Sequence, residues 1–113
     1  MQITRKIWVN GVFDVLHRGH IELFNFAKNQ GGYLTVGIDA DKRVKESKGE
    51  SRPVNNETDR KYFLEAIKYV DEVKIFNSDE QLSNIIKQYK PDCMVIGSDW
   101  MGKEVIGGQY AKE

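Results

Sequence analysis

Short apolar runs alternate along the chain with longer stretches in which apolar residues recur every three or four positions. The short runs contain many β-branched and aromatic residues and end near glycine, proline or asparagine, which predicts strands. The longer stretches have the period of a helix with one buried face. We therefore expect four strands, at residues 3–10, 33–38, 73–76 and 93–96.

Four helices are expected between and after these strands. The first, at residues 19–29, would bury Ile21, Phe24 and Ala27, with Leu23 and Phe26 beside them. A second, at residues 39–48, would start as a short helix and fray into a loop. For the third, at residues 57–69, the predicted buried side is Tyr62, Phe63, Ala66, Ile67 and Val70. The fourth would be capped by Ser78 or Asp79 and carry Leu82, Ile85, Ile86 and Tyr89.

Strands that alternate with helices are typical of a Rossmann-like parallel α/β sheet, here of about four to five strands, with right-handed crossovers. The 113 residues suit one hydrophobic core and leave no room for two, so residues 1–113 are expected to form one domain. Such sheets bind ligands beyond the carboxyl ends of the strands, where the strand order reverses. The expected site is therefore built from the loops after the first and fourth strands, residues 11–20 and 97–102.

Charge and cysteine content narrow the class of function. Seventeen basic and seventeen acidic residues give a formal net charge of zero, which does not favour a long nucleic acid as partner. Cys93 is the single cysteine and lies in an apolar run, so we expect a core residue, no disulfide and a cytoplasmic protein. No apolar run approaches the roughly 20 residues that span a bilayer, and the N-terminus lacks an apolar signal region. Neither membrane insertion nor secretion is expected.

The segment Gly11-Val12-Phe13-Asp14-Val15-Leu16-His17-Arg18-Gly19-His20 carries the most specific chemistry of the chain. Gly11 allows a sharp turn close to a ligand, and Asp14 can hold that turn by accepting backbone hydrogen bonds. Gly19 leaves the amides of a helix start uncovered. If His20 lies in the first helical turn, both imidazoles and the helix N-terminus converge on one anion. That arrangement suits a phosphate that gains charge in a transition state.

The two histidines also admit simpler interpretations. His17 and His20 could be surface residues without a ligand. They could form part of a zinc site, although no third Cys, His or carboxylate stands at an obvious ligand spacing. A glycine-rich dinucleotide loop is excluded, because the Gly-x-Gly-x-x-Gly spacing is absent.

Residues 11–14 followed by residues 17–20 closely resemble the signature of the cytidylyltransferase-like, or HIGH-superfamily, nucleotidyltransferases. The resemblance covers almost the whole chain. The adenylyltransferase domains that make ADP-heptose are similar at Lys-Gly-Glu-Ser-Arg-Pro-Val-Asn (48–55), at Arg60, and at residues 69–73, 90–92 and 97–100. Asp-Trp-Met-Gly-Lys (99–103) is closer to the glycerol-3-phosphate cytidylyltransferases.

This resemblance implies an activity. Members of the family join an NTP to a phosphorylated small molecule, release pyrophosphate and form no covalent enzyme intermediate. The acceptor's phosphate oxygen attacks the α-phosphorus in line, and the protein positions the groups and stabilises charge. We expect ATP or CTP as donor and a sugar or polyol phosphate as acceptor, such as heptose 1-phosphate or glycerol 3-phosphate. The alternative is a nucleotide- or partner-binding module without turnover.

The resemblance also implies roles for individual residues. The catalytic set would be His17 and His20, which contact the NTP phosphates, together with Lys48 and Arg60. The groups close to the nucleotide would be Gly11, Val12, Phe13, Asp14, Gly19, Gly97, Asp99 and Trp100, with Asp14 steadying the loop rather than acting as a base. Substrate phosphate would be clamped by Arg52 through forked hydrogen bonds, and by Lys45 as a rival of Lys48.

Structural interpretations stand beside several of these roles. The cations at 45, 48 and 52 could form a solvated basic loop. Arg60 could pair with Glu57 or Glu65 on its own helix. Trp100 could be a hydrophobic plug over the edge of the sheet.

The expected partners follow from the same reasoning. They are an NTP and a small phosphorylated substrate, with neither nucleic acid nor membrane, and Mg²⁺ would arrive with the triphosphate rather than in an all-protein metal site. Relatives usually add a fifth strand and a helix that opens on a Ser/Thr-rich motif. No Ser-Thr-Thr follows Gly97, so we expect a C-terminally truncated domain. The exposed edge beside the fourth strand leaves room for a second subunit in a homodimer.

Overall fold

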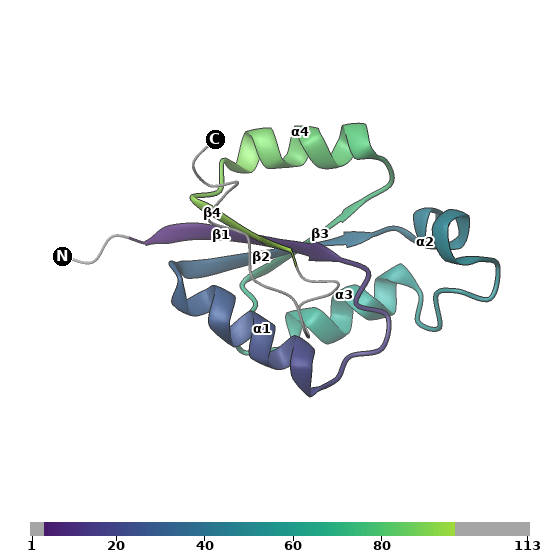
Figure 1. The fold of residues 1–113 in the computed structure, drawn as a ribbon, viewed down its shortest axis with the longest axis horizontal. Helices are drawn as coiled ribbons and strands as arrows, with labels where there is room; N and C mark the ends of the chain where they lie inside the picture. Colours follow the sequence, from purple (N-terminus) through teal and green to yellow (C-terminus); the bar gives the residue numbers. More distant parts are fainter. Residues whose placement is uncertain (1–3, 97–113) are drawn as a thin grey trace.

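The computed structural model describes residues 4–96, which form a parallel sheet with helices on both faces. The strands are β1 (Arg5–Gly11), β2 (Gly32–Asp39), β3 (Glu72–Phe76) and β4 (Cys93–Ile96). The helices are α1 (Arg18–Asn29), α2 (Asp41–Lys48), α3 (Glu57–Glu65) and α4 (Asp79–Tyr89). Figure 1 shows α1 and α3 below the sheet, α4 above it, and α2 beyond the end of β2. The expected Rossmann-like α/β class is confirmed.

The strand order is β3-β2-β1-β4, and every pair of neighbours is parallel. The chain therefore moves outward from β1 to β3 and then returns to place β4 on the other side of β1. The order reverses between β1 and β4, so the loop after β1 leaves the sheet at the point where α/β proteins bind ligands. The partner loop after β4, residues 97–102, lies outside the described residues.

Alternation along the strands divides the core into two faces. Ile7 and Val9 of β1 join the large apolar cluster that faces α1 and α3. Trp8 points the other way, is fully buried, and lies 5.8 Å from the ring of Tyr89 on α4. A Cβ at Gly37 of β2 would come within 2.3 Å of the Trp8 ring. Glycine is therefore needed at this position for the indole to lie flat against the sheet.

Two helices differ from the sequence-based expectation. α3 ends at Glu65 instead of continuing to residue 69, and Tyr62 and Phe63 are 70% and 44% exposed. Its buried residues are Arg60 and Leu64, four positions apart, because a buried cation rather than an aromatic stripe defines its inner face. α2 is helical through Lys48 instead of fraying. In α1 the buried residues are Gly19, Leu23, Phe24 and Ala27, whereas Ile21, which was predicted to be buried, is only partly buried and Phe26 is 37% exposed.

Two aspartates fix the register of the outer strands by the same geometry. Asp71, just before β3, accepts a hydrogen bond from the Leu34 amide (2.7 Å) and donates its own amide to the Leu34 carbonyl (2.9 Å). Asp92, just before β4, makes the equivalent pair with Lys6 of β1 (2.8 and 2.7 Å). Asp71 differs in one respect, because it also forms an ion pair with Lys28 at the end of α1 (2.6 Å).

Replacing Asp71 with alanine is expected to destabilise the fold more than replacing Asp92 with alanine. Both changes remove a carboxylate that accepts a strand amide, which costs about 1–3 kcal/mol when the amide stays buried. The bond from the Leu34 amide to Asp71 is half-buried, and Asp71 also pairs with Lys28, whereas the Asp92 bond is exposed. Chemical denaturation of both variants measures the difference. Equal losses would show that the Lys28 contact and the burial contribute nothing.

Within residues 4–96, none of the helices has the length and apolar character needed to cross a membrane.

Candidate functional site

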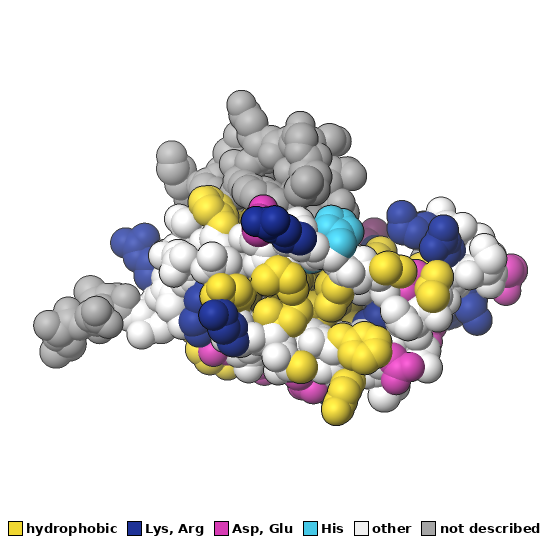
Figure 2. Space-filling model, turned by 90° about the horizontal axis from the view of Figure 1, so that it is seen from below, with side chains coloured by type: hydrophobic (Ala, Val, Ile, Leu, Met, Phe, Trp, Pro, Cys, Tyr) yellow, Lys and Arg dark blue, Asp and Glu magenta, His cyan; other side chains and the backbone are white. Residues whose placement is uncertain are grey.

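A cleft of about 580 Å³ opens at the carboxyl end of β1. The loop after β1, the first turn of α1, the end of α2 and the loop that follows it form its walls. Its lining residues are Val12, Phe13, Asp14, Val15, His17, His20, Lys48 and Arg52. Figure 2 shows this region from below: hydrophobic side chains gather over α1 and α3, and basic side chains stand at the α2 end. The structure thus brings together most of the residues that the sequence singled out in its first half.

The two histidines form a reciprocal cap at the start of α1. His17 is the N-cap residue, and its Nδ1 accepts a hydrogen bond from the Gly19 amide (3.0 Å). His20, in the first turn, accepts the His17 amide with its own Nδ1 (3.2 Å). The ring centroids lie 4.0 Å apart, with an angle of 31° between the planes. The expectation that His20 lies in the first helical turn is confirmed.

This cap determines the tautomer of both rings. An Nδ1 that accepts a backbone hydrogen bond carries no proton, so the neutral imidazole carries its proton on Nε2. Each ring is therefore fixed as an Nε2–H donor, and both rings line the cleft. Two Nε2–H donors beside a helix N-terminus form a suitable contact for phosphate oxygens.

Burial lowers the pKa of His20 below its ordinary value of 6.5, and the neighbouring His17 lowers it further. Phe13 contributes to this burial, because its ring meets the His20 ring edge-on at 5.4 Å. His20 is consequently neutral at pH 7, the form in which it can cap the helix.

Acidification is expected to remove the stabilisation that His20 provides. Because the folded-state pKa lies below the unfolded value of 6.5, the contribution is fully present above about pH 6.5 and is lost as the pH falls through the folded-state pKa. The free energy of unfolding, measured from about pH 8 to about pH 5, should fall more steeply for the wild type than for His20→Gln. Glutamine is a matched control, since it is an ordinary residue at this position of a capping box. Parallel curves would contradict the prediction.

Phe13 folds back beneath the loop and gives it its shape. Its backbone φ is 51°, in the left-handed region that a non-glycine residue seldom adopts, and its ring packs against Phe24 at 5.1 Å. A Cβ at Gly11 would lie 3.1 Å from that ring. Gly11 therefore provides the space in which the Phe13 ring turns back, while Val12, Asp14 and the rest of the loop stay at the cleft.

Asp14 joins two loops. Its two carboxylate oxygens accept the amides of Val54 and Asn55, each at 2.7 Å, and its carbonyl accepts Nδ2 of Asn55 at 2.6 Å. The expectation that Asp14 accepts backbone hydrogen bonds is confirmed, although the amides come from the loop before α3 rather than from its own turn. Both carboxylate oxygens of Asp14 therefore already accept hydrogen bonds from the protein backbone.

The cations of the cleft come from α2 and the loop that follows it. Lys48 is the last residue of α2, and Arg52 lies four residues further on; both line the cleft. Within residues 4–96 neither one takes part in an ion pair. Lys45, proposed from the sequence as a rival of Lys48, is not among the lining residues.

Arg60 occupies a different position from the one that the sequence suggested. Its side chain is fully buried, and it donates to the carbonyls of Asn55 (3.0 Å), Val12 (3.0 Å) and Asp39 (2.7 Å). It also forms an ion pair with Asp41 at 2.8 Å, instead of with Glu57 or Glu65. The guanidinium therefore connects the segments that form the walls of the cleft, but Arg60 is not one of the residues that line it.

The sequence analysis missed two partners of this arginine, the carboxylate of Asp41 and the backbone carbonyl of Asp39. Asp39 ends β2 and Asp41 begins α2, so both stand at the carboxyl edge of the sheet, and that position was the available signal. Val15 also lines the cleft, and the sequence analysis did not name it as a site residue. Its position within residues 11–20 was the one feature that could have indicated it. Gly97, Asp99 and Trp100 lie outside the described residues. Gly19 is buried in the first turn of α1.

Comparison with known proteins finds a matching family and several relatives. Residues 8–106 match the family model described as cytidylyltransferase-like. The chain is 47% identical over 107 residues to "Bifunctional protein HldE" of Campylobacter fetus subsp. fetus, a match that covers 95% of this chain and 23% of that protein. It is 42% identical, with the same two coverages, to the protein of that name in Helicobacter pylori (strain P12). The chain thus spans about a quarter of the length of these curated relatives.

A solved structure shares the fold. The lipopolysaccharide core biosynthesis protein from Thermoplasma volcanium GSS1 superposes with a TM-score of 0.73 and is 26% identical in sequence. The match covers 88% of this chain and 79% of that one.

Proposed function

Because this chain belongs to the cytidylyltransferase-like family, we propose that it transfers a nucleoside monophosphate from an NTP to a small phosphorylated acceptor and releases pyrophosphate. One observation carries the proposal: two imidazoles fixed as Nε2–H donors share a cleft with Lys48 and Arg52. The one carboxylate among the lining residues, that of Asp14, has both of its oxygens engaged by backbone amides. The cleft is therefore suited to several phosphate groups.

The chemistry needs positioning more than proton transfer. An oxygen of the acceptor's phosphate attacks the α-phosphorus, and the bond from that phosphorus to the bridging oxygen of the pyrophosphate breaks in line with it. The attacking phosphate is already an anion at neutral pH, so no general base is required. His17 and His20 donate hydrogen bonds to oxygens that gain charge, and Lys48 and Arg52 balance the charge of the leaving pyrophosphate.

We further propose a sugar phosphate as acceptor and ATP as donor. The segment at residues 48–55 resembles the adenylyltransferase domains that make ADP-heptose, and the solved neighbour is titled a lipopolysaccharide core biosynthesis protein. CTP with glycerol 3-phosphate is the second pair, supported by the resemblance of residues 99–103.

Mg²⁺ is proposed to enter with the triphosphate. Among residues 4–96 no three His, Cys, Asp or Glu side chains gather as a metal site, and both oxygens of Asp14 are engaged. Phosphate oxygens and water would supply the ligands of the ion, which is the usual arrangement for Mg²⁺ at a nucleotide. The ion would reduce the charge of the triphosphate as it enters the cleft.

The test is pyrophosphate release from ATP and from CTP over a panel of phosphorylated acceptors, with heptose 1-phosphate and glycerol 3-phosphate as the first two. Release that depends on both an NTP and an acceptor is the expected result. Calorimetry with ATP and CTP tests the alternative. If a nucleotide binds tightly but no pair of NTP and acceptor gives product, the protein is a binding module and not an enzyme. If the protein neither releases pyrophosphate nor binds a nucleotide, both the enzyme and the binding module are refuted.

A further inference from the structure

The position of Lys48 depends on how α2 is held, because Lys48 is the last residue of that helix. α2 has eight residues, and Val44 is its one buried side chain. A helix this short is marginal by itself, and the burial of one valine contributes about 1.5–3 kcal/mol. Polar contacts must therefore decide the direction in which α2 projects from the sheet.

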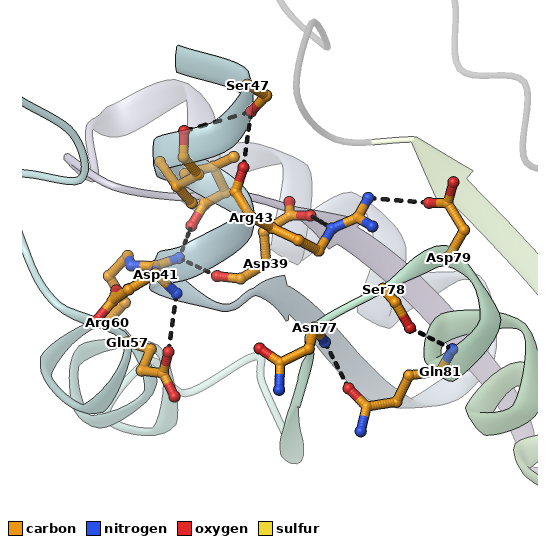
Figure 3. A network of polar contacts seen from close by, with 12 residues as sticks. Asp39, Asp41, Arg43, Ser47, Glu57, Arg60, Asn77, Ser78, Asp79 and Gln81 are labelled. Carbon is orange, nitrogen blue, oxygen red and sulfur yellow. Dashed lines mark hydrogen bonds and ion pairs between the residues drawn. The ribbon is translucent and has the colours of Figure 1, made fainter. Parts of the chain in front are cut away.

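Two arginines make the ion pairs among these contacts, as Figure 3 shows, and Glu57 accepts the Asp41 amide (2.8 Å). Arg60 holds the start of α2 through Asp41. Arg43 lies within α2, and its Nε donates to Asp39 at the end of β2 (2.8 Å). Its Nη2 forms an ion pair with Asp79 at the start of α4 (3.0 Å). The Arg43 guanidinium also lies over the ring of Phe76, the last residue of β3, at 5.3 Å. Arg43 thus ties α2 to the carboxyl ends of β2 and β3 and to α4 at once.

We propose that Arg43 is a positioning residue that fixes α2 and thereby places Lys48 at the phosphate cleft. This inference rests on the proposed function in so far as it takes the cleft to be a phosphate site. Arg43 is not among the residues that line the cleft, so it acts through Lys48 rather than on a ligand. The forked guanidinium matters, because its rigid, planar donors hold two carboxylates in fixed directions, whereas the ammonium of lysine is a point charge on a flexible stem.

The length of α2 indicates how far Lys48 would move if the helix tilted. Lys48 is five residues from Arg43, which is about 7.5 Å along a helix, so a tilt of roughly 10° there moves the Lys48 backbone by about 1.3 Å. Displacements of about 1 Å can cost up to 100-fold in rate. The exposed side chain of Asp79 weakens one of the two ion pairs, so we expect a loss of about tenfold in kcat/KM when Arg43 is replaced.

The test is a double-mutant cycle between Arg43→Met and Lys48→Ala. Methionine keeps an apolar stem over Phe76 and removes both ion pairs. Two readouts are taken: kcat/KM for the NTP, and the affinity for inorganic pyrophosphate measured by calorimetry. Each single variant is expected to be weaker than the wild type in both, and the double variant to be no weaker than Lys48→Ala alone, because a missing lysine cannot be misplaced. Additive losses would overturn the inference.

Two further variants sharpen this result. Arg43→Lys retains the positive charge without the fork, so it is expected to stay impaired; wild-type behaviour would show that charge alone suffices and would overturn the positioning role. Lys74→Gln is the matched control, since it breaks another half-exposed ion pair, with Glu72 on β3, away from the cleft (3.2 Å). It is expected to leave both readouts unchanged.

The two readouts separate the two proposals. If no nucleotidyl transfer occurs but the pyrophosphate affinities are non-additive, the proposed function fails and the role of Arg43 stands. If transfer occurs and the cycle is additive in both readouts, the proposed function stands and the role of Arg43 fails. A wild-type protein that binds no pyrophosphate would overturn the role of Arg43, because Lys48 would then serve no anion site.

Discussion

Replacing Arg60 with methionine is expected to lower the free energy of unfolding by about 3–5 kcal/mol, the cost of removing one partner from a buried ion pair. The side chain is fully buried and donates to three carbonyls and to the carboxylate of Asp41. Methionine fills part of the space and satisfies none of these groups. The loss should appear as a lower denaturant midpoint in chemical unfolding.

Two other variants separate burial from charge. Arg60→Lys keeps the charge but offers a single donor centre, so it should recover a minor part of the lost stability. Arg18→Met is the matched control, because Arg18 pairs with Glu22 on the surface with its side chain 91% exposed. Exposed pairs contribute about 0–1 kcal/mol, so this variant should unfold almost as the wild type does. An Arg60→Met protein that behaves like Arg18→Met would contradict the role of Arg60.

Replacing His17 with alanine is expected to lower kcat about 100-fold or more, since one preorganised donor to a developing oxyanion is worth about 3 kcal/mol. The imidazole is fixed by the Gly19 amide as an Nε2–H donor, and His17 lines the cleft. The same change removes the N-cap of α1, which costs about 1 kcal/mol of stability. Pyrophosphate release under saturating NTP measures the first effect, and chemical denaturation measures the second.

His17→Asn distinguishes these two effects. Asparagine is a preferred N-cap residue, so it should restore the stability of α1. Its side chain is shorter than that of histidine and lacks the Nε2–H donor, so the loss of kcat should persist. Full activity in His17→Asn would show that capping, rather than the donor, is what the reaction needs, and the assignment of His17 would be wrong.

Much of the candidate site was predictable because its residues are close together in the sequence. His17 is the N-cap and His20 lies three positions further on, so the capping geometry of the helix start brings their rings together. Asp14 was expected to accept backbone hydrogen bonds, and it does. The sequence could not show which amides it binds, because Val54 and Asn55 are about 40 residues away.

Arg60 illustrates the opposite case. A lone arginine on a predicted helix beside Glu57 and Glu65 suggested either a phosphate clamp or a pair within the helix. Its actual partners come from three separate segments, and whether a cation faces a cavity or the interior depends on how those segments pack. Tyr62 and Phe63 were misplaced for the same reason, because Arg60 and Leu64 take the inner face of α3.

By itself, the sequence determined the alternation of strands and helices, the parallel α/β class and the segment around the two histidines. These features depend on local periodicity and on short-range spacing, which can be recognised in the sequence without knowledge of the fold. Only the tertiary structure decided which residues line the cleft and which hold it from behind. Lys48 reaches the cleft through the direction of α2, and that direction is set by Arg43 and Arg60 through contacts between distant segments. Such contacts leave no periodic trace in a single sequence, because each one depends on the packing of the whole sheet.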